Sequence, residues 1–247
     1  MPDRPFLVLQ ARPEDEAADE EFAAILSRGG LDAGEVSRIR LEREDVGGIG
    51  DVAGIILGGG PGCVSDPPAR KSQIDARIEA AVMALLPDIC ARDVPFLGCC
   101  YGIGALGQYL GGRVGQGRWS EPVGLARCET TAAGMCDPLL DGLPPCFDAF
   151  VAHKEAVEAL PPGCETLVTS PTCPVQMMRF GANVYATQFH PEADGESFAL
   201  RVAVYRAHGY FDRDEADHLI AFARGLDAPW PPRILANFVA RYRSRSR

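Results

Sequence analysis

The stretch PFLGCCYGIGALGQYLGG, residues 95–112, runs from a short apolar segment through two adjacent cysteines into a glycine-rich segment. The apolar residues predict a buried strand over 94–98, and the pattern after the cysteines predicts a helix over 101–112. VAGIILGGGPG, residues 52–62, has a similar form, because an apolar run ends abruptly in glycines. Buried strands that run into tight turns and are separated by helices are typical of a parallel sheet.

The rest of the chain extends this pattern on both sides. A further strand is predicted over 5–11, and helices over 14–30 and about 71–92. From about 120 to 190, shorter β-rich runs separated by turn residues indicate an antiparallel or mixed portion, and three helical patterns follow residue 193. We therefore expect an α/β protein whose sheet is covered by helices on both faces.

The expected organisation is a single domain, residues 1–247. Its core would cover about residues 1–205, and a helical C-terminal extension would cover about 206–247. In RILANFVARY, residues 233–242, apolar side chains recur at helical spacing, which favours packing on the core over a contact with another subunit.

Composition excludes several classes of protein. A net charge of −10 argues against nucleic-acid binding, which needs a basic face. No apolar run approaches the roughly 18 residues of a membrane span, and the first residues lack the layout of a secretory signal. Nine cysteines, an odd number in a chain of this size, suit a reducing compartment, and none is spaced as in a zinc site. We expect a cytoplasmic protein with no metal and no membrane partner.

The spacing of glycines selects one of the two adjacent cysteines as a candidate nucleophile. A nucleophile elbow needs small residues two positions before and after the nucleophile, and Gly98 and Gly102 flank Cys100 in this way. Cys99 would have bulky flanks and is expected to be a buried neighbour. The N-terminus of the following helix would lower the thiol pKa from about 8.5. This stretch alone also fits a glycine-rich strand-to-helix turn that merely contains a cysteine.

A thiolate nucleophile usually needs a histidine. The chain has four, and His208 and His218 lie in polar helical contexts near the C-terminus. His190 ends the predicted strand VYATQFHPE, residues 184–192, and Glu192 follows two residues later. In extended backbone the two side chains project to the same side, about 6.6 Å apart along the chain. Glu192 can then accept a hydrogen bond from the imidazole and orient it, although a lone His-Pro-Glu also fits a capped strand end.

Acyl chemistry also needs donors for the negative charge that develops on the carbonyl oxygen. Gly59 and Gly60 supply backbone N–H groups at the end of a neighbouring predicted strand, and the N–H of Tyr101 follows the nucleophile directly. A phosphate-binding loop is the alternative for this glycine run, but no Gly-Lys-Ser/Thr follows it. We therefore expect Gly59, Gly60 and Tyr101 to form an oxyanion hole.

These three motifs, over about residues 52 to 192, resemble those of the class I (triad-type) glutamine amidotransferases. The resemblance implies an open, mostly parallel, flavodoxin-like sheet flanked by helices, here with a helical C-terminal extension. It also implies a triad of Cys100, His190 and Glu192 that releases ammonia from glutamine through a γ-glutamyl thioester, and no cofactor.

Within that family the chain is similar to free-standing proteins like the amidotransferase domain of GMP synthase, and to γ-glutamyl peptidases. The matching segment is residues 150–181, in which His153 is followed by Glu155. The resemblance implies that Gly104, His153 and Gln188 bind substrate, although His153 equally fits a structural hydrogen-bonding role. Many members read G-x-C-x-G-x-Q, and here Gly104 occupies the position of the glutamine.

Three functions follow as hypotheses. The first is a glutaminase or amidotransferase that passes ammonia to a separate synthetase subunit. The second is a hydrolase or peptidase of a small γ-glutamyl compound. The third is a non-catalytic interaction module that has kept the fold. In the first two cases the partner is a small-molecule substrate, either glutamine or a γ-glutamyl compound.

Overall fold

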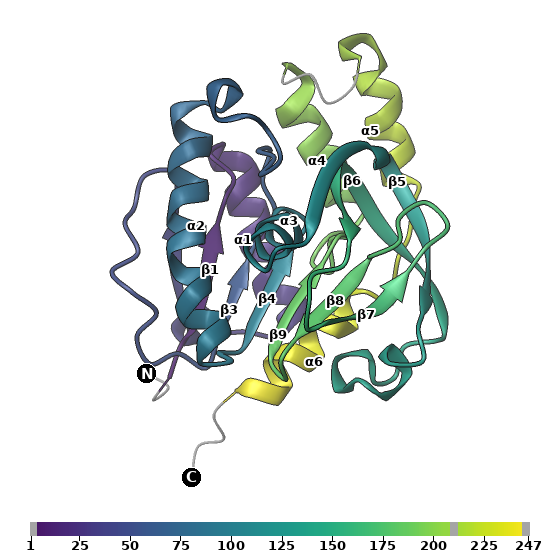
Figure 1. Ribbon diagram of the computed structural model, residues 1–247. Helices are drawn as coiled ribbons and strands as arrows, with labels where there is room; N and C mark the ends of the chain where they lie inside the picture. The colour runs from purple at the N-terminus through teal and green to yellow at the C-terminus, as the bar shows by residue number, and fades with distance from the viewer. Residues whose placement is uncertain (1–3, 208–211, 244–247) are drawn as a thin grey trace.

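The computed structural model describes residues 4–207 and 212–243. These residues form one nine-stranded sheet with the order β2-β1-β3-β4-β9-β8-β7-β5-β6. The pairings from β2 to β9 are parallel, and those from β9 to β6 are antiparallel. The sheet therefore has a parallel half and an antiparallel half that meet at β9 (Figure 1).

The bounds of the elements are as follows. The parallel half consists of β1 (Phe6–Gln10), β2 (Val36–Arg40), β3 (Gly54–Leu57), β4 (Phe96–Cys99) and β9 (Val184–Thr187). The antiparallel half adds β5 (Arg113–Thr130), β6 (Cys146–Ala159), β7 (Cys164–Thr169) and β8 (Met177–Phe180). The α-helices are α1 (Asp15–Gly29), α2 (Gln73–Ala91), α3 (Tyr101–Tyr109), α4 (Gly195–Val204), α5 (Ala216–Arg224) and α6 (Pro232–Tyr242).

Alternate residues of the buried strands face two separate hydrophobic clusters. In β3, Ile55 and Leu57 pack with residues of α2 and α3, whereas Ile56 packs with residues of α1 and α6. This follows from the two-residue period of a strand. The helices consequently cover both faces of the parallel half, with α2 and α3 on one side and α1 and α6 on the other (Figure 1).

The C-terminal helices pack on the rest of the molecule. Four residues of α6 are at most 1% exposed and belong to the same cluster as Phe6 and Val8 of β1: Ile234, Leu235, Phe238 and Val239. The predicted packing of residues 233–242 on the core is thus confirmed. Helix α5 packs against α4 through a third, smaller cluster that includes Phe198 and Ala223. His208, one of the four histidines, lies outside the described residues.

The predicted strands over 5–11 and 94–98 and the predicted helices over 14–30 and 71–92 are present within two residues, whereas the predicted helix over 101–112 ends at Tyr109 and β2 was not predicted. Its sequence, VSRIR, has two arginines and is only partly buried, because β2 lies at the edge of the sheet. An edge strand needs less apolar sequence than a central strand, so hydrophobic patterning gives a weak signal there. Among the described residues, no helix is long and apolar enough to cross a membrane.

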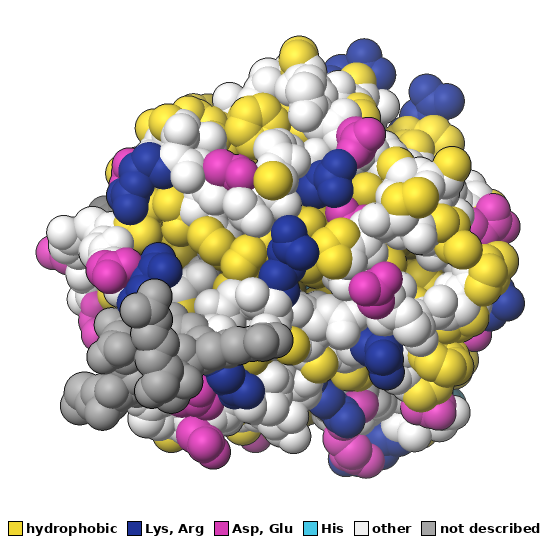
Figure 2. All heavy atoms as spheres, turned by 90° about the horizontal axis from the view of Figure 1, so that it is seen from below, with side chains coloured by type: hydrophobic (Ala, Val, Ile, Leu, Met, Phe, Trp, Pro, Cys, Tyr) yellow, Lys and Arg dark blue, Asp and Glu magenta, His cyan; other side chains and the backbone are white. Residues whose placement is uncertain are grey.

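The surface shown in Figure 2 carries acidic and basic side chains in a mixed arrangement. Among the described residues visible in that view, the basic side chains do not gather into a continuous patch. This face therefore lacks the basic surface on which nucleic-acid binding would depend.

Candidate active site

The candidate site lies where four parallel strands end. Arg12 follows β1, the glycines from Gly58 follow β3, Cys100 follows β4 and His190 follows β9. The strands are in register, with Leu57 opposite Gly98 and Cys99 opposite Thr187. Because parallel strands end at the same edge of a sheet, residues far apart in the sequence meet there.

Cys100 occupies a strained turn between β4 and α3. Its backbone has φ 51° and ψ −87°, and it directly precedes the first residue of α3. A side chain at Gly98 would approach the ring of Phe96 to 2.9 Å and the Cα atom of Gly102 to 3.0 Å, so the turn requires glycine at 98. A side chain at Gly102 would make only ordinary contact with Leu57, at 3.5 Å. The turn geometry matches the predicted elbow, although the restriction applies mainly to its first glycine.

The neighbouring cysteine points away from this turn. Cys99 is 1% exposed and belongs to the hydrophobic cluster shared by α1 and α6. The prediction that Cys99 is a buried neighbour is confirmed.

The protonation of Cys100 differs from the expectation. Burial raises the pKa of its thiol to about 12, and the nearby cation of Arg12 opposes this only in part. The expected lowering of the thiol pKa is therefore wrong, because desolvation disfavours the thiolate more strongly than Arg12 favours it. Cys100 rests as a neutral thiol, and attack on a carbonyl requires a base that removes its proton.

His190 has the properties of such a base. Burial lowers its pKa, so the ring is neutral near pH 7, and the carboxylate of Glu192 opposes that shift. Nδ1 of His190 lies 2.8 Å from Oε1 of Glu192. Nδ1 donates this bond, which leaves Nε2 free to accept a proton. The ring also packs edge-on against Phe198, with 5.5 Å between centroids.

Glu192 is held ionised from two sides. Burial would raise its pKa, but His190 and Arg201 outweigh burial and hold the pKa of this carboxyl well below its usual range. Nη2 of Arg201 lies 3.0 Å from the same Oε1 atom that faces His190. Arg201 also pairs with Glu20 of α1, and this contact ties α4 to α1.

The glycine segment after β3 requires a correction to the predicted oxyanion hole. The N–H of Gly59 donates to Oε1 of the buried Glu21, at 3.0 Å. Gly59 is thus already engaged and is not the oxyanion donor that was predicted. Gly60 lines the cavity beside Cys100, and the backbone of Tyr101 begins the helix that follows the nucleophile. Gly60 and Tyr101 remain as candidate donors.

Two cavities meet at Cys100. The wider one has a volume of about 570 Å³, and its walls include Arg12, His190, Arg201 and Tyr205. The narrower one, about 20 Å³, is lined by Gln188 and Glu155 and shares Cys100 with the first. The cavities also share Gly60 and His153. Of the predicted substrate-binding residues, the structure therefore places His153 and Gln188 at this site.

Gly104 lies under Glu155 and lines neither cavity. A Cβ atom at Gly104 would approach Oε1 of Glu155 to 2.6 Å. The carboxylate of Glu155 therefore fills the space that a side chain at position 104 would use. The predicted contact of Gly104 with substrate is consequently not present in this arrangement, since Glu155 lies between.

His153 is part of a hydrogen-bonded network in the antiparallel half. It lies opposite Glu121 in the pairing of β5 with β6, and its Nε2 atom is 2.7 Å from Oε2 of Glu121. Its Nδ1 atom donates to the carbonyl of Glu155 at 2.9 Å. Glu121 also accepts bonds from Thr172 and Gln176, and these donors together with His153 outweigh burial and lower its pKa. This favours the structural role of His153 over direct contact with substrate.

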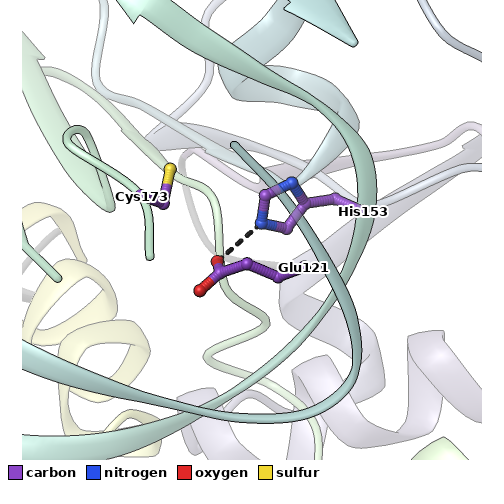
Figure 3. Close-up of side chains that lie close together, drawn as sticks. All are labelled: Glu121, His153 and Cys173. Carbon is purple, nitrogen blue, oxygen red and sulfur yellow. Dashed lines mark hydrogen bonds and ion pairs between the residues drawn. The ribbon is translucent and has the colours of Figure 1, made fainter. Parts of the chain in front are cut away.

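Glu121, His153 and Cys173 also form a candidate metal-ligand set, since their ligand atoms lie within 4.8 Å of one another (Figure 3). Figure 3 shows the ring of His153 directed at Glu121, with the thiol of Cys173 apart from that bond. Burial raises the pKa of Cys173 to about 12, which keeps the thiol neutral. The thiol of Cys173 donates instead to the carbonyl of Val175, whereas Glu121 and His153 are bonded to each other and line the wider cavity.

Sequence reasoning missed Arg12, Glu21 and Arg201. Each is at most 5% exposed, although charged residues are rarely buried. A signal for Glu21 was present, because it lies on the same helical face as the buried Ala17 and Ile25. Arg201 similarly lies three residues after the buried Phe198. An acid or base on the apolar face of a predicted helix marks a buried ion pair.

Comparisons with known proteins agree on one family. The model of the family glutamine amidotransferase class-I matches residues 22–203. The GMP synthase (glutamine-hydrolyzing) of Neisseria meningitidis is 32% identical over 140 residues, which cover 56% of this chain and 24% of that protein. The enzyme of the same name from Marinobacter nauticus is 29% identical over 188 residues, or 72% of this chain and 30% of that protein. The chain thus spans less than a third of the length of these curated relatives.

A solved structure supports the fold independently. The crystal structure of a glutamine amidotransferase from Thermotoga maritima aligns over 98% of this chain and 99% of its own, with a TM-score of 0.73 and 16% identity. This likeness confirms the predicted fold class, a mostly parallel α/β sheet flanked by helices.

Proposed function

Because this chain belongs to the class I glutamine amidotransferase family, we propose that it hydrolyses the side-chain amide of glutamine through a thioester on Cys100. One observation carries the proposal. The thiol lies on a strained strand-to-helix turn, in the same cavity as the His190–Glu192 pair. A nucleophile, a neutral base and a group that orients the base are thereby combined.

In the first half of the proposed reaction, His190 removes the proton of Cys100 as sulfur attacks the amide carbonyl. The oxyanion that forms accepts hydrogen bonds from the N–H groups of Gly60 and Tyr101. The C–N bond then breaks, and the proton on His190 passes to the departing nitrogen, which leaves as ammonia. The product is a γ-glutamyl thioester on Cys100.

In the second half, water replaces the amide nitrogen. His190 removes a proton from the water, which attacks the thioester carbonyl, and the same donors hold the second oxyanion. Collapse breaks the C–S bond, returns the proton to Cys100 and releases glutamate. Glu192 stays ionised throughout and stabilises the imidazolium of His190 in each half.

Two measurements test this proposal. Glutamate release from glutamine should be detectable with purified protein and absent when Cys100 is replaced by alanine. A glutamine-like chloroketone followed by peptide mass mapping should label Cys100. Labelling of Cys99 in place of Cys100 would contradict the assignment of the nucleophile, and the absence of both turnover and labelling would support the non-catalytic module.

A second candidate substrate is a γ-glutamyl compound larger than glutamine. The cavity of about 570 Å³ is within the range that holds drug-sized ligands, and glutamine would fill only part of it. Arg12, Lys154 and Arg201 line this cavity beside one acid, Glu121. The two arginines already pair with buried or partly buried acids, and the cationic lining as a whole still favours a substrate with an additional carboxylate. Many family members have glutamine at the position of Gly104, and here the carboxylate of Glu155 fills the space that such a side chain would need.

A matched panel separates the two substrates. We expect γ-glutamylglycine to be hydrolysed with a higher kcat/KM than its glycinamide counterpart, which has the same size but lacks the terminal carboxylate. Glutamine should be the poorest of the three if the larger substrate is correct. Equal rates for the matched pair, with glutamine fastest, would restrict the function to glutamine hydrolysis.

We also propose that the ammonia serves a synthetase. The names of the curated relatives describe glutamine-hydrolyzing GMP synthases, of which this chain matches less than a third. Co-purification of a synthetase subunit with this protein from the native source tests the proposal.

A cytoplasmic location remains a prediction from the use of cysteine. All nine cysteines are free thiols.

A further inference from the structure

The glycine segment after β3 is held at its start by a buried carboxylate of α1. Oε1 of Glu21 accepts the N–H of Gly59 at 3.0 Å and Nε of Arg12 at 2.8 Å. Glu21 is fully buried, and Gln10 donates to its second oxygen at 3.3 Å. A Cβ atom at Gly58 would lie 2.2 Å from that oxygen, so the carboxylate packs directly on the backbone. The start of the segment therefore has little freedom to move.

A second buried carboxylate holds the other end of the same segment. Oε1 of Glu155 accepts the N–H of Val64 at 3.0 Å. Oε2 accepts the N–H of Ser65 at 2.9 Å and its hydroxyl at 2.6 Å. Glu155 belongs to β6, in the antiparallel half, and is 7% exposed. Residues 59–65 are thus tied to α1 at one end and to β6 at the other.

Gly60, a candidate oxyanion donor, lies between these two anchors. A Cβ atom there would approach the carbonyl oxygen of Ala11 to 2.7 Å, so the backbone is in close contact with the chain after β1. Gly60 borders both cavities that contain Cys100. Donors stabilise an oxyanion most when they are fixed in advance, because no reorganisation is then needed during the reaction.

We propose that Glu21 and Glu155 are positioning residues, two buried carboxylates that fix the ends of residues 59–65 so that the backbone of Gly60 faces Cys100. This inference rests on the proposed function. Neither carboxylate contacts the reacting atoms, and both act through the backbone they hold. Glu21 is balanced by the cation of Arg12, and Glu155 by three hydrogen bonds from neutral donors.

The test replaces each carboxylate by its amide. In Glu155→Gln, an NH2 group replaces one of the two acceptor oxygens and cannot accept a bond from Val64 or Ser65, so we expect kcat for the best substrate to fall at least about tenfold. KM should stay within about threefold of the wild type. Glu21→Gln should act in the same direction, and should also leave Arg12 without its counter-charge.

Matched controls lie on the same two elements. Glu158→Gln removes a partly exposed acid of β6 that pairs with Arg113, and Glu16→Gln removes an exposed acid of α1. Both should leave kcat within about twofold of the wild type. Alkylation of Cys100 by iodoacetamide passes through no oxyanion, and loss of the Glu155 charge favours the thiolate, so the rate should not fall in Glu155→Gln. A parallel loss of alkylation and turnover in Glu155→Gln would overturn the proposal.

Hydrogen exchange provides a readout that does not depend on activity. Amides of residues 58–65 should exchange at least about tenfold faster in Glu155→Gln than in wild type and Glu158→Gln. If the wild type hydrolyses none of the substrates and the amides still exchange faster in Glu155→Gln, the anchoring is supported and the proposed function is refuted. Unchanged exchange and unchanged kcat, in a wild type that is active, would refute the anchoring alone.

Discussion

The two halves of the sheet place their buried polar groups differently. In the parallel half, Cys100 and His190 lie on the connections just after strands, where the backbone of Cys100 is strained. In the antiparallel half, Glu121 and His153 face each other across paired strands. All four residues line the wider cavity, so the difference between the halves lies in the backbone. The proposed nucleophile is placed by a strained turn after a strand, whereas Glu121 and His153 are held by strand register.

The largest effect on activity is expected at the strained turn. Cys100→Ala should lower glutamate release at least about 10³-fold, because no other residue supplies the sulfur nucleophile. Cys100→Gly should be equally inactive but more stable than Cys100→Ala by about 1 kcal/mol, since glycine relieves a positive φ. Glutamate assays and thermal unfolding measure the two effects. Equal stability of the two variants would show that the turn stores little strain.

A pH profile tests the base and its partners. Activity needs neutral His190, so it should fall as pH decreases through the pKa of His190, which lies below its usual value of about 6.5. Arg201→Met removes a cation that lowers this pKa, so the acidic limb of kcat/KM should move to higher pH. Glu192→Gln removes the group that raises the pKa, so the limb should move to lower pH.

Glu192→Gln should also lower kcat by about 10² to 10³, less than Cys100→Ala, because Glu192 orients and does not attack. Arg224→Met, which alters an exposed ion pair on α5, is the control and should leave the profile unchanged. Movement of the limb in the same direction in both Arg201→Met and Glu192→Gln would contradict the assigned charges.

The antiparallel half should respond in stability more than in catalysis. Glu121→Gln weakens the buried hydrogen bonds that Glu121 makes with His153 and Gln176, and we expect the free energy of unfolding to fall by about 2 kcal/mol. The value of kcat/KM should fall less than about tenfold. Chemical denaturation and glutamate assays measure the two effects. The control is Glu129→Gln, which alters an exposed acid on the same strand and should change neither quantity. A loss of activity as large as at Cys100 would erase the distinction between the halves.

The smallest effect is expected at the second glycine of the turn. A methyl group at Gly102 meets only ordinary contact with Leu57, so Gly102→Ala should keep activity within about threefold. Gly98→Ala would place a methyl group 2.9 Å from the ring of Phe96 and should disrupt the turn. Activity and thermal unfolding of this pair of variants should therefore diverge. Similar behaviour would mean that the turn tolerates small side chains on both sides.

The sequence predicted those parts of the site that depend on local spacing. The glycine before Cys100 and the two-residue separation of His190 and Glu192 are read directly from short motifs. The engagement of Gly59 was missed because it depends on Glu21, which comes from another element. The raised pKa of Cys100 was missed because it depends on the burial of the whole turn. Contacts and burial of this kind arise only after the elements are assembled.

Prediction of the fold was likewise limited to features that have a local sequence pattern. Central strands such as β3 and β4 were predicted because they are buried on both faces and therefore continuously apolar. The edge strand β2 was not, because solvent covers part of it and permits arginine. The order of strands, including the position of β9 beside β4, follows from pairings between distant segments and has no local signature.

The occupied space above Gly104 restricts the order in which substitutions at this site can accumulate. A glutamine introduced at position 104 would collide with Glu155, whose carboxylate would lie 2.6 Å from the new Cβ atom. Glu155 must therefore be shortened first, which releases Val64 and Ser65. Either single change is expected to be worse than the pair. Positions 104 and 155 should consequently evolve together, and an engineered glutamine site in this chain would have to be selected as a double variant.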